Sequence, residues 1–385
     1  MNLFELLSDP DIELPLSWSN SNDFEEFINN RFEIFLERIN DLDSSTIADR
    51  VKNRFDAMNK CCDEIKKAVR STFEGQPHNA YQHLIKAMTS IREELEGLAI
   101  NKLGDNDLGI LFRGRRTSSP SLSKEEMFHI PFELRHLVAT QRYSIPGLPC
   151  LYLTGSLYTC WEEMGRPPLH ELQISGLWLK DATTFKVLNF SNRPKRLNKY
   201  LSPDGSISDI YDKNKTQLKN TLINSIVIWP LMAACSIIVK NRNAPYKPEY
   251  VIPQMVLQWI TKNEEFDGLC YFSTHVSAVT NSPFPTSNFI FPAQNVVPSG
   301  RCSILCNSFK MTDPVSWQIL SAVNAGEGVR GSEIPMYNYE IIEGIEEPYW
   351  KTQFGMNELK INKMKSIIAL KNLNGEPTLG DIYEG

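Results

Sequence analysis

The fold is decided by residues 142–163, which read RYSIPGLPCLYLTGSLYTCWEE. The middle of this stretch, Cys150–Thr154, is apolar and β-prone, and proline and glycine residues bound it, which predicts a buried strand. Ser156 is a favourable N-cap residue, and the sequence LYTCWEE after it predicts the first turns of a helix. A strand that leads directly into a helix places Tyr152 and Glu163, eleven residues apart, where both can face one cleft.

Each of these residues also has an ordinary structural interpretation. A single tyrosine on a strand is typical of the core or its rim, and two adjacent glutamates are typical of a solvated helix surface. We take Glu163 as the candidate functional carboxylate. Its neighbour Glu162 is the alternative that lies on the helix surface.

Composition indicates a globular protein with a sizeable core. The chain has 385 residues, 42% of them hydrophobic and 22% charged, which is enough for one large or two ordinary domains. The formal net charge is −6. A nucleic acid is therefore disfavoured as the obligate partner, because its phosphate backbone is bound by basic surfaces.

The eight cysteines are spread through apolar segments and do not form a disulfide pattern. The first residues show neither a basic region nor an apolar targeting segment, so a cytoplasmic location is expected. Cys302 and Cys306 have no second Cys or His pair at ligand spacing, so no metal is expected. The apolar segment 217–239 contains Pro230 and falls short of the roughly 18 to 20 residues of a membrane span, which predicts a buried helix and no membrane contact.

Domain organisation follows from a change in pattern near residue 105. Residues 23–103 carry apolar side chains at spacings of three and four, which predicts a small helical bundle. The turn-rich stretch 101–107 marks a boundary between a helical domain, 1–105, and a second domain, 106–385. Strands and helices are mixed in the second domain, with a further strand expected at 301–307. The predicted fold class is α+β.

Several short motifs occur in one order along the second domain. They are a basic strand ending at Arg113, the Arg142-Tyr143 pair before a Pro-Gly turn, the strand of Tyr152 with Glu163 eleven residues later, and a strand ending at Ser273. Together they resemble the RES domain family, whose fold is similar to that of ADP-ribosyltransferases and whose members act on NAD⁺. The resemblance covers about residues 108 to 310, and the long spacing from Glu163 to Ser273 implies an insertion near 185–245 and a C-terminal extension.

The N-terminal helices resemble the HEPN-like region found ahead of some RES domains. HEPN ribonucleases carry Arg and His at short spacing. Here Arg70 and His78 are separated by seven residues that include Gly75-Gln76-Pro77. This departure disfavours RNA cleavage by the helical domain.

The resemblance implies a set of site residues. Glu163, Tyr152 and Arg113 are the implied catalytic residues, and Arg113, Arg142, Tyr152 and Ser273 the implied NAD⁺-binding residues. Cleavage of the nicotinamide–ribose bond passes through an oxocarbenium-like state, which a carboxylate such as Glu163 stabilises, whereas arginines suit the pyrophosphate.

The expected function is therefore an NAD⁺-degrading enzyme, a glycohydrolase or phosphorylase acting as a bacterial toxin or defence effector. The resemblance implies an antitoxin or immunity protein as a partner, and the helical domain suits homo-oligomer formation. Two alternatives stay open: ADP-ribose transfer to a protein, and a catalytically silent module that binds a nucleotide. The motifs of Rossmann dehydrogenases and P-loop enzymes do not occur in the sequence.

Overall fold

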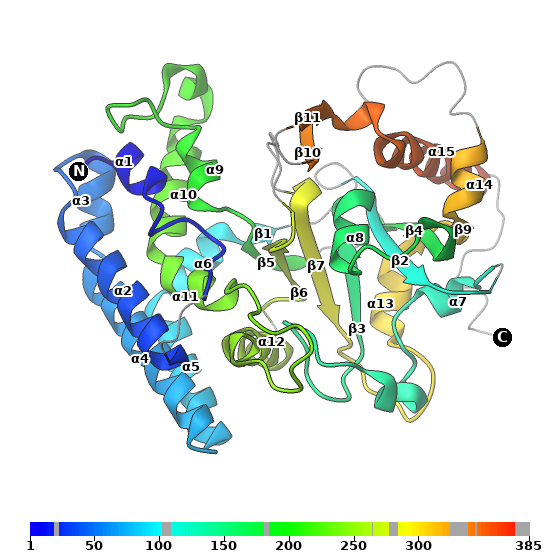
Figure 1. Cartoon of the computed structure of the whole chain (residues 1–385), viewed down its shortest axis with the longest axis horizontal. Coiled ribbons are helices and arrows are strands. Elements are labelled where there is room, and N and C mark those ends of the chain that lie inside the picture. Colours follow the sequence, from blue (N-terminus) through cyan, green and yellow to red (C-terminus); the bar gives the residue numbers. More distant parts are fainter. Residues whose placement is uncertain are drawn as a thin grey trace. The chain divides into compact units, whose positions relative to one another are not determined.

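The computed structural model resolves two compact units, each built from separate stretches of the chain (Figure 1). Unit 1 comprises residues 1–100, 140–145 and 188–265, and unit 2 comprises residues 101–139, 146–187 and 266–385. The structure describes residues 1–18, 23–101, 109–119, 121–180, 185–263, 265–276, 284–323, 338–342 and 345–373.

Unit 1 is helical, as the apolar spacing predicts. Helix α2 begins after the N-cap Asp23 and buries Phe24, Ile28, Phe32, Phe35 and Ile39 on one face. Phe35 stacks on Trp229, with ring centroids 4.3 Å apart. The helices of unit 1 are α1 (Leu3–Ser8), α2 (Phe24–Asn40), α3 (Thr46–Lys52), α4 (Phe55–Phe73), α5 (Pro77–Ser90), α6 (Arg92–Leu98), α10 (Lys215–Val227), α11 (Trp229–Cys235) and α12 (Val251–Lys262), with the short α9 (Pro194–Asn198).

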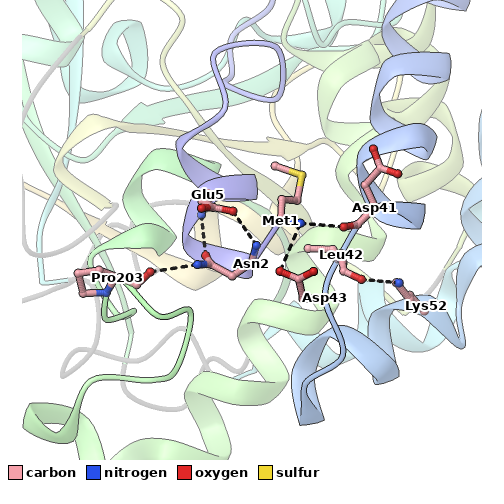
Figure 2. Close-up of polar contacts among 8 residues, drawn as sticks. All are labelled: Met1, Asn2, Glu5, Asp41, Leu42, Asp43, Lys52 and Pro203. Atoms are coloured by element: carbon pink, nitrogen blue, oxygen red, sulfur yellow. Dashed lines mark hydrogen bonds and ion pairs between the residues drawn. The ribbon is translucent and has the colours of Figure 1, made fainter.

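Polar contacts fix the first helix of unit 1 (Figure 2). Asn2 and Glu5 form a reciprocal capping box at the start of α1. The side chain of Asn2 also donates to the carbonyl of Pro203 at 3.1 Å. The α-amino group of Met1 donates to the carbonyl of Asp41 at 2.9 Å, so α1 is tied to two distant parts of its unit.

Residues 188–265 differ from the predicted domain division. They belong to the same unit as the N-terminal helices, whereas the sequence suggested an insertion within the second domain. The physical reason is the burial of apolar side chains. Helices α10, α11 and α12 pack on α3–α6, and every residue of α11 is buried. The predicted single helix over 217–239 is in fact two helices, broken at Ile228 just before Pro230.

The described helices differ in length and in apolar character, the two properties that decide whether a helix can cross a membrane. None of them is by itself long and apolar enough to cross a membrane, although the bent pair formed by residues 209–227 and α11, with 59° between its two parts, meets the length and composition criteria together.

Unit 2 is built on an antiparallel sheet, which with the flanking helices confirms the α+β class. Neighbouring strands run in the order β6-β7-β3-β2-β4-β8, and β9 also pairs with β4. The strands of this sheet are β2 (Leu111–Arg116), β3 (Cys150–Thr154), β4 (Leu172–Leu179), β6 (Gly268–Phe272), β7 (Ser287–Pro292), β8 (Phe309–Met311) and β9 (Val315–Ser316). Strands β10 (Asn338–Ile342) and β11 (Ile345–Pro348) form a separate pair. Along the chain, two boundaries between the units fall within β1 (Ile100–Asn101) and β5 (Lys186–Phe190).

The sheet is nearly divided in its middle. β2 pairs with β4 over six residues and β3 pairs with β7 over five, but β2 and β3 share the single register pair Phe112↔Thr154. Beyond this pair the two strands separate. The chain returns from β3 through Ser156 into α8 (Leu157–Glu163), so the predicted strand and helix are both confirmed.

Further helices complete unit 2. They are α7 (Lys124–Met127), α13 (Ser303–Ser308), α14 (Trp317–Ala322) and α15 (Gln353–Leu373), with 3₁₀ turns at Phe132–Leu137 and Tyr349–Lys351. The strand predicted at 301–307 is wrong, because most of this segment forms α13. Leu305 and Ser308 face the interior at a helical spacing of three, a pattern that an apolar stretch this short cannot distinguish from a strand.

Candidate functional site

The structure brings Glu163 and Ser273 into direct contact across 110 residues of sequence. The hydroxyl of Ser273 donates to Glu163 Oε1 at 2.5 Å, and the side-chain amide of Asn288 donates to the same oxygen at 2.9 Å. We call these three residues the Glu163 cluster. Glu163 is exposed, whereas Ser273 and Asn288 are buried. Two buried donors therefore fix one oxygen of a carboxylate that faces solvent.

Three elements supply the cluster. Glu163 ends α8, Ser273 follows the last residue of β6, and Asn288 lies on β7. The backbone amide of His275 donates to Ser273 Oγ at 3.0 Å. The serine hydroxyl is thus held as an acceptor on one side and as a donor toward Glu163 on the other.

Local sequence explains why α8 lies close to the sheet. The Ser156 side chain caps the helix by accepting from the amide of Thr159 at 3.2 Å. Gly114 of β2 lies under the helix, and a Cβ placed there would come within 2.8 Å of Met164 Sδ and 2.9 Å of Cys160 Sγ. A larger residue at position 114 would clash with these side chains, so glycine allows α8 to lie close to β2.

Tyr152 lies on the same face of the sheet as Asn288. Thr154 pairs with Asn288 across β3 and β7, and side chains two residues apart on a strand share a face, so Tyr152 projects beside them. Its side chain is partly buried, and burial raises the pKa of its phenol well above the usual value. Tyr152 therefore offers a neutral aromatic surface next to the Glu163 cluster.

Arg113 has a different environment from the one expected of a phosphate ligand. Its guanidinium donates to the main-chain carbonyls of Met127 at 2.5 Å, Tyr152 at 2.8 Å and Phe128 at 3.2 Å. Burial, with the nearby charge of Arg115, lowers its pKa to about 10, which leaves it protonated at neutral pH. Each of its three nitrogens makes one of these contacts, and the contact with the carbonyl of Tyr152 joins β2 to β3 where the strands separate. These contacts give Arg113 a structural role. Its roles in catalysis and in NAD⁺ binding stay predictions.

Arg142 belongs to unit 1 and makes its contacts there. It donates to the carbonyl of Cys235 at 3.1 Å, and its guanidinium lies 5.4 Å from the ring centroid of Tyr250. These contacts are made within unit 1, and the role of Arg142 in NAD⁺ binding stays a prediction. They do not link it to the Glu163 cluster, which lies within unit 2.

Glu162 contradicts the expectation of a solvated helix surface. Its side chain is buried, and its Oε2 accepts from Arg166 at 2.9 Å, whereas Glu163 is the exposed neighbour. The helix therefore presents Glu163, not Glu162, to solvent. Seven residues are too few for an apolar pattern to fix this rotation from sequence.

We expect Glu162→Ala to lower the free energy of unfolding by about 1–3 kcal/mol, because it leaves a buried cavity and removes the partner of Arg166. Urea denaturation measures this loss. The exposed Glu347, on β11, provides the matched control, and Glu347→Ala should change the free energy of unfolding little. Equal stability of the two variants would contradict the buried position of Glu162.

His129 gives unit 2 a specific pH dependence. It is fully buried, its Nε2 accepts from the amide of Cys302 at 3.0 Å, and its Nδ1 lies 2.8 Å from the carbonyl of Ile130, so the neutral ring fits both contacts. Burial lowers the pKa of His129 to about 4.

An unfolded chain binds a proton at His129 below about pH 6.5, whereas the folded chain does so only near pH 4. The contribution of His129 is therefore fully present above pH 6.5 and is lost as the pH falls toward 4. We expect the slope of unfolding free energy against pH in this window to be smaller in His129→Gln than in the wild type. Identical slopes would contradict this account.

Asn288 is the site residue that sequence analysis missed. It lies in a proline-rich stretch, and no local pattern distinguishes it from an ordinary strand residue. Its register opposite Thr154, on the strand next to Tyr152, is visible only in the folded sheet. Within the described ranges, no three His, Cys, Asp or Glu side chains are grouped so that they could hold a metal ion.

Comparison with known proteins shows a relative that matches most of the chain. The chain is 30% identical over 364 residues to a protein of Bacillus subtilis (strain 168) that is named "Putative toxin YopC", and the match covers 92% of this chain and 79% of that protein. No family model matches the chain, and no solved structure does. The length and identity of the match establish common descent, so this chain belongs to the same protein family as YopC.

Proposed function

We propose that the protein is an NAD⁺-consuming enzyme of the RES type and that Glu163 is its catalytic carboxylate. The observation that supports this most is the Glu163 cluster: Ser273 and Asn288 hold one carboxylate oxygen, and the side chain faces solvent. Among the described residues, no other side chain donates a hydrogen bond to this carboxylate.

The proposed reaction requires few other groups in the site. Nicotinamide is a cationic leaving group, so cleavage of its bond to ribose builds positive charge on the sugar and needs no covalent catalyst. A carboxylate fixed before the reaction begins stabilises that charge without reorganising. Tyr152 offers an aromatic surface for the nicotinamide or the ribose. The bond breaks with both electrons leaving on nicotinamide, and water, phosphate or a protein side chain then supplies the new bond to the anomeric carbon.

The family relationship suggests a biological role for the proposed reaction. The relative in Bacillus subtilis is named a toxin, and loss of cellular NAD⁺ stops growth. We therefore propose that this chain acts as a toxin through NAD⁺ consumption, with an antitoxin or immunity protein as its partner.

Product analysis tests the proposal. The purified protein is incubated with NAD⁺ alone, with phosphate, and with candidate protein acceptors, and the products are separated. We expect free nicotinamide together with ADP-ribose, ADP-ribose 1″-phosphate or an ADP-ribosylated protein, and the product identifies the acceptor. Binding of NAD⁺ without release of nicotinamide would instead favour the silent nucleotide-binding module.

A further inference from the structure

The first turn of α8 is capped by a distant part of the chain. Helix α8 has only seven residues, and its first two, Leu157 and Tyr158, are buried, so their amides need protein acceptors. The Ser156 side chain accepts from the amide of Thr159 and not from the amides of Leu157 and Tyr158. The amide of Leu157 donates to Glu358 Oε1 at 2.6 Å, and the amide of Tyr158 donates to the hydroxyl of Tyr349 at 3.3 Å.

The two acceptors also bind each other. The hydroxyl of Tyr349 donates to Glu358 Oε1, so this one oxygen accepts hydrogen bonds from both a hydroxyl and a helix amide. Tyr349 and Glu358 are buried, and Glu358 lies 201 residues from Leu157 in the sequence. We call Glu358, Tyr349 and the amides of Leu157 and Tyr158 the Glu358 network.

Apolar packing holds the network in place. Phe354 of α15 contacts Tyr158 and Trp161 of α8, with ring centroids 5.4 Å and 5.5 Å apart. Gly355 allows the start of α15 to approach the preceding turn, because a Cβ there would come within 2.3 Å of the carbonyl of Tyr349. The sequence at this helix is thus adapted to deliver Glu358 to the buried end of α8.

We propose that α15 positions the catalytic helix, with Glu358 as a positioning residue that fixes the N-terminal end of α8 and thereby the direction of Glu163 at its other end. The activity part of this inference rests on the proposed function. Because α8 is two turns long, a tilt at its first residue is transmitted to Glu163 at its last residue. The C-terminal region therefore takes part in forming the Glu163 cluster.

The charge state of Glu358 suggests the conservative variant. Burial raises the pKa of Glu358 to about 8, so the group is largely protonated at neutral pH. Glutamine has the same shape, is neutral and keeps a carbonyl oxygen for the Leu157 amide. Leucine keeps a similar volume but offers no acceptor.

The experiment uses the full chain and two readouts, hydrogen exchange of the α8 amides and steady-state nicotinamide release from NAD⁺. We expect Glu358→Leu to speed exchange in α8 by about tenfold or more, as for loss of a buried hydrogen bond, and to lower kcat by a similar factor with KM little changed. Glu358→Gln should restore both values toward the wild type. Glu347→Leu, at an exposed glutamate of β11, is the matched control and should change neither.

Tyr349→Phe is a milder test, since it removes one hydroxyl and keeps the ring. It should speed α8 exchange as well, and it decides the question if Glu358→Leu does not fold. Unchanged exchange in α8 of the folded variants would overturn the inference. If the wild type releases no nicotinamide, the proposed function fails, and the exchange measurement alone still decides whether Glu358 fixes α8.

Discussion

Replacing Glu163 with glutamine is expected to lower kcat for nicotinamide release by about 10²-fold or more, with little change in the affinity for NAD⁺. Glutamine is nearly isosteric, and its carbonyl oxygen can still accept from Ser273 and Asn288, so the local structure should persist. The variant removes only the negative charge that meets the oxocarbenium. Steady-state kinetics gives kcat, and calorimetry gives the affinity.

Two comparisons sharpen this expectation. Glu347→Gln changes an exposed glutamate outside the cluster and should leave kcat unchanged. Ser273→Ala removes one of the two donors that orient the carboxylate, so it should lower kcat by less than Glu163→Gln. A variant at Glu163 with wild-type kcat would remove α8 from the active site.

Replacing Arg113 with alanine is expected to lower the free energy of unfolding by about 3 kcal/mol or more, because it removes three hydrogen bonds to main-chain carbonyls. The carbonyl of Phe128 keeps a donor in Arg115, whereas those of Met127 and Tyr152 lose the Arg113 contact. It also removes the side chain that joins β2 to β3 where the sheet is nearly divided. Urea denaturation followed by tryptophan fluorescence measures the change. Arg113→Lys should lose most of the same stability, since one ammonium cannot reproduce the three directed contacts of the guanidinium.

Arg116 is the matched control on the same strand. Its side chain is 64% exposed and pairs with Glu171 on the surface, so Arg116→Ala should cost less than about 1 kcal/mol. If Arg113→Ala instead raised KM for NAD⁺ and left the urea midpoint unchanged, Arg113 would be a substrate ligand and not a structural residue.

The strand and helix at the centre of unit 2 could be predicted because their signals are local. Cys150–Thr154 is apolar between turn residues, Ser156 is a strong cap, and the structure places both elements within one residue of the prediction. The pairing of Glu163 with Ser273 depends on a family resemblance, because no local pattern relates residues 110 positions apart.

Other features depend on tertiary packing alone. The rotation of α8, which buries Glu162 and exposes Glu163, is set by contacts with the rest of unit 2 and not by the sequence of seven residues. The sequence predicts Arg113 as a ligand of the pyrophosphate. In the structure its guanidinium contacts main-chain carbonyls that other segments of the chain supply. Glu358 is the single acidic residue of α15, and nothing in the local sequence marks it as buried.

A crystal structure of E163Q protein with uncleaved NAD⁺ tests the central claim most directly. The account predicts that the anomeric carbon of the nicotinamide riboside lies within about 3–3.5 Å of the side chain at position 163, beside Tyr152 and next to Ser273 and Asn288. NAD⁺ bound with its nicotinamide–ribose bond away from this cluster would contradict it.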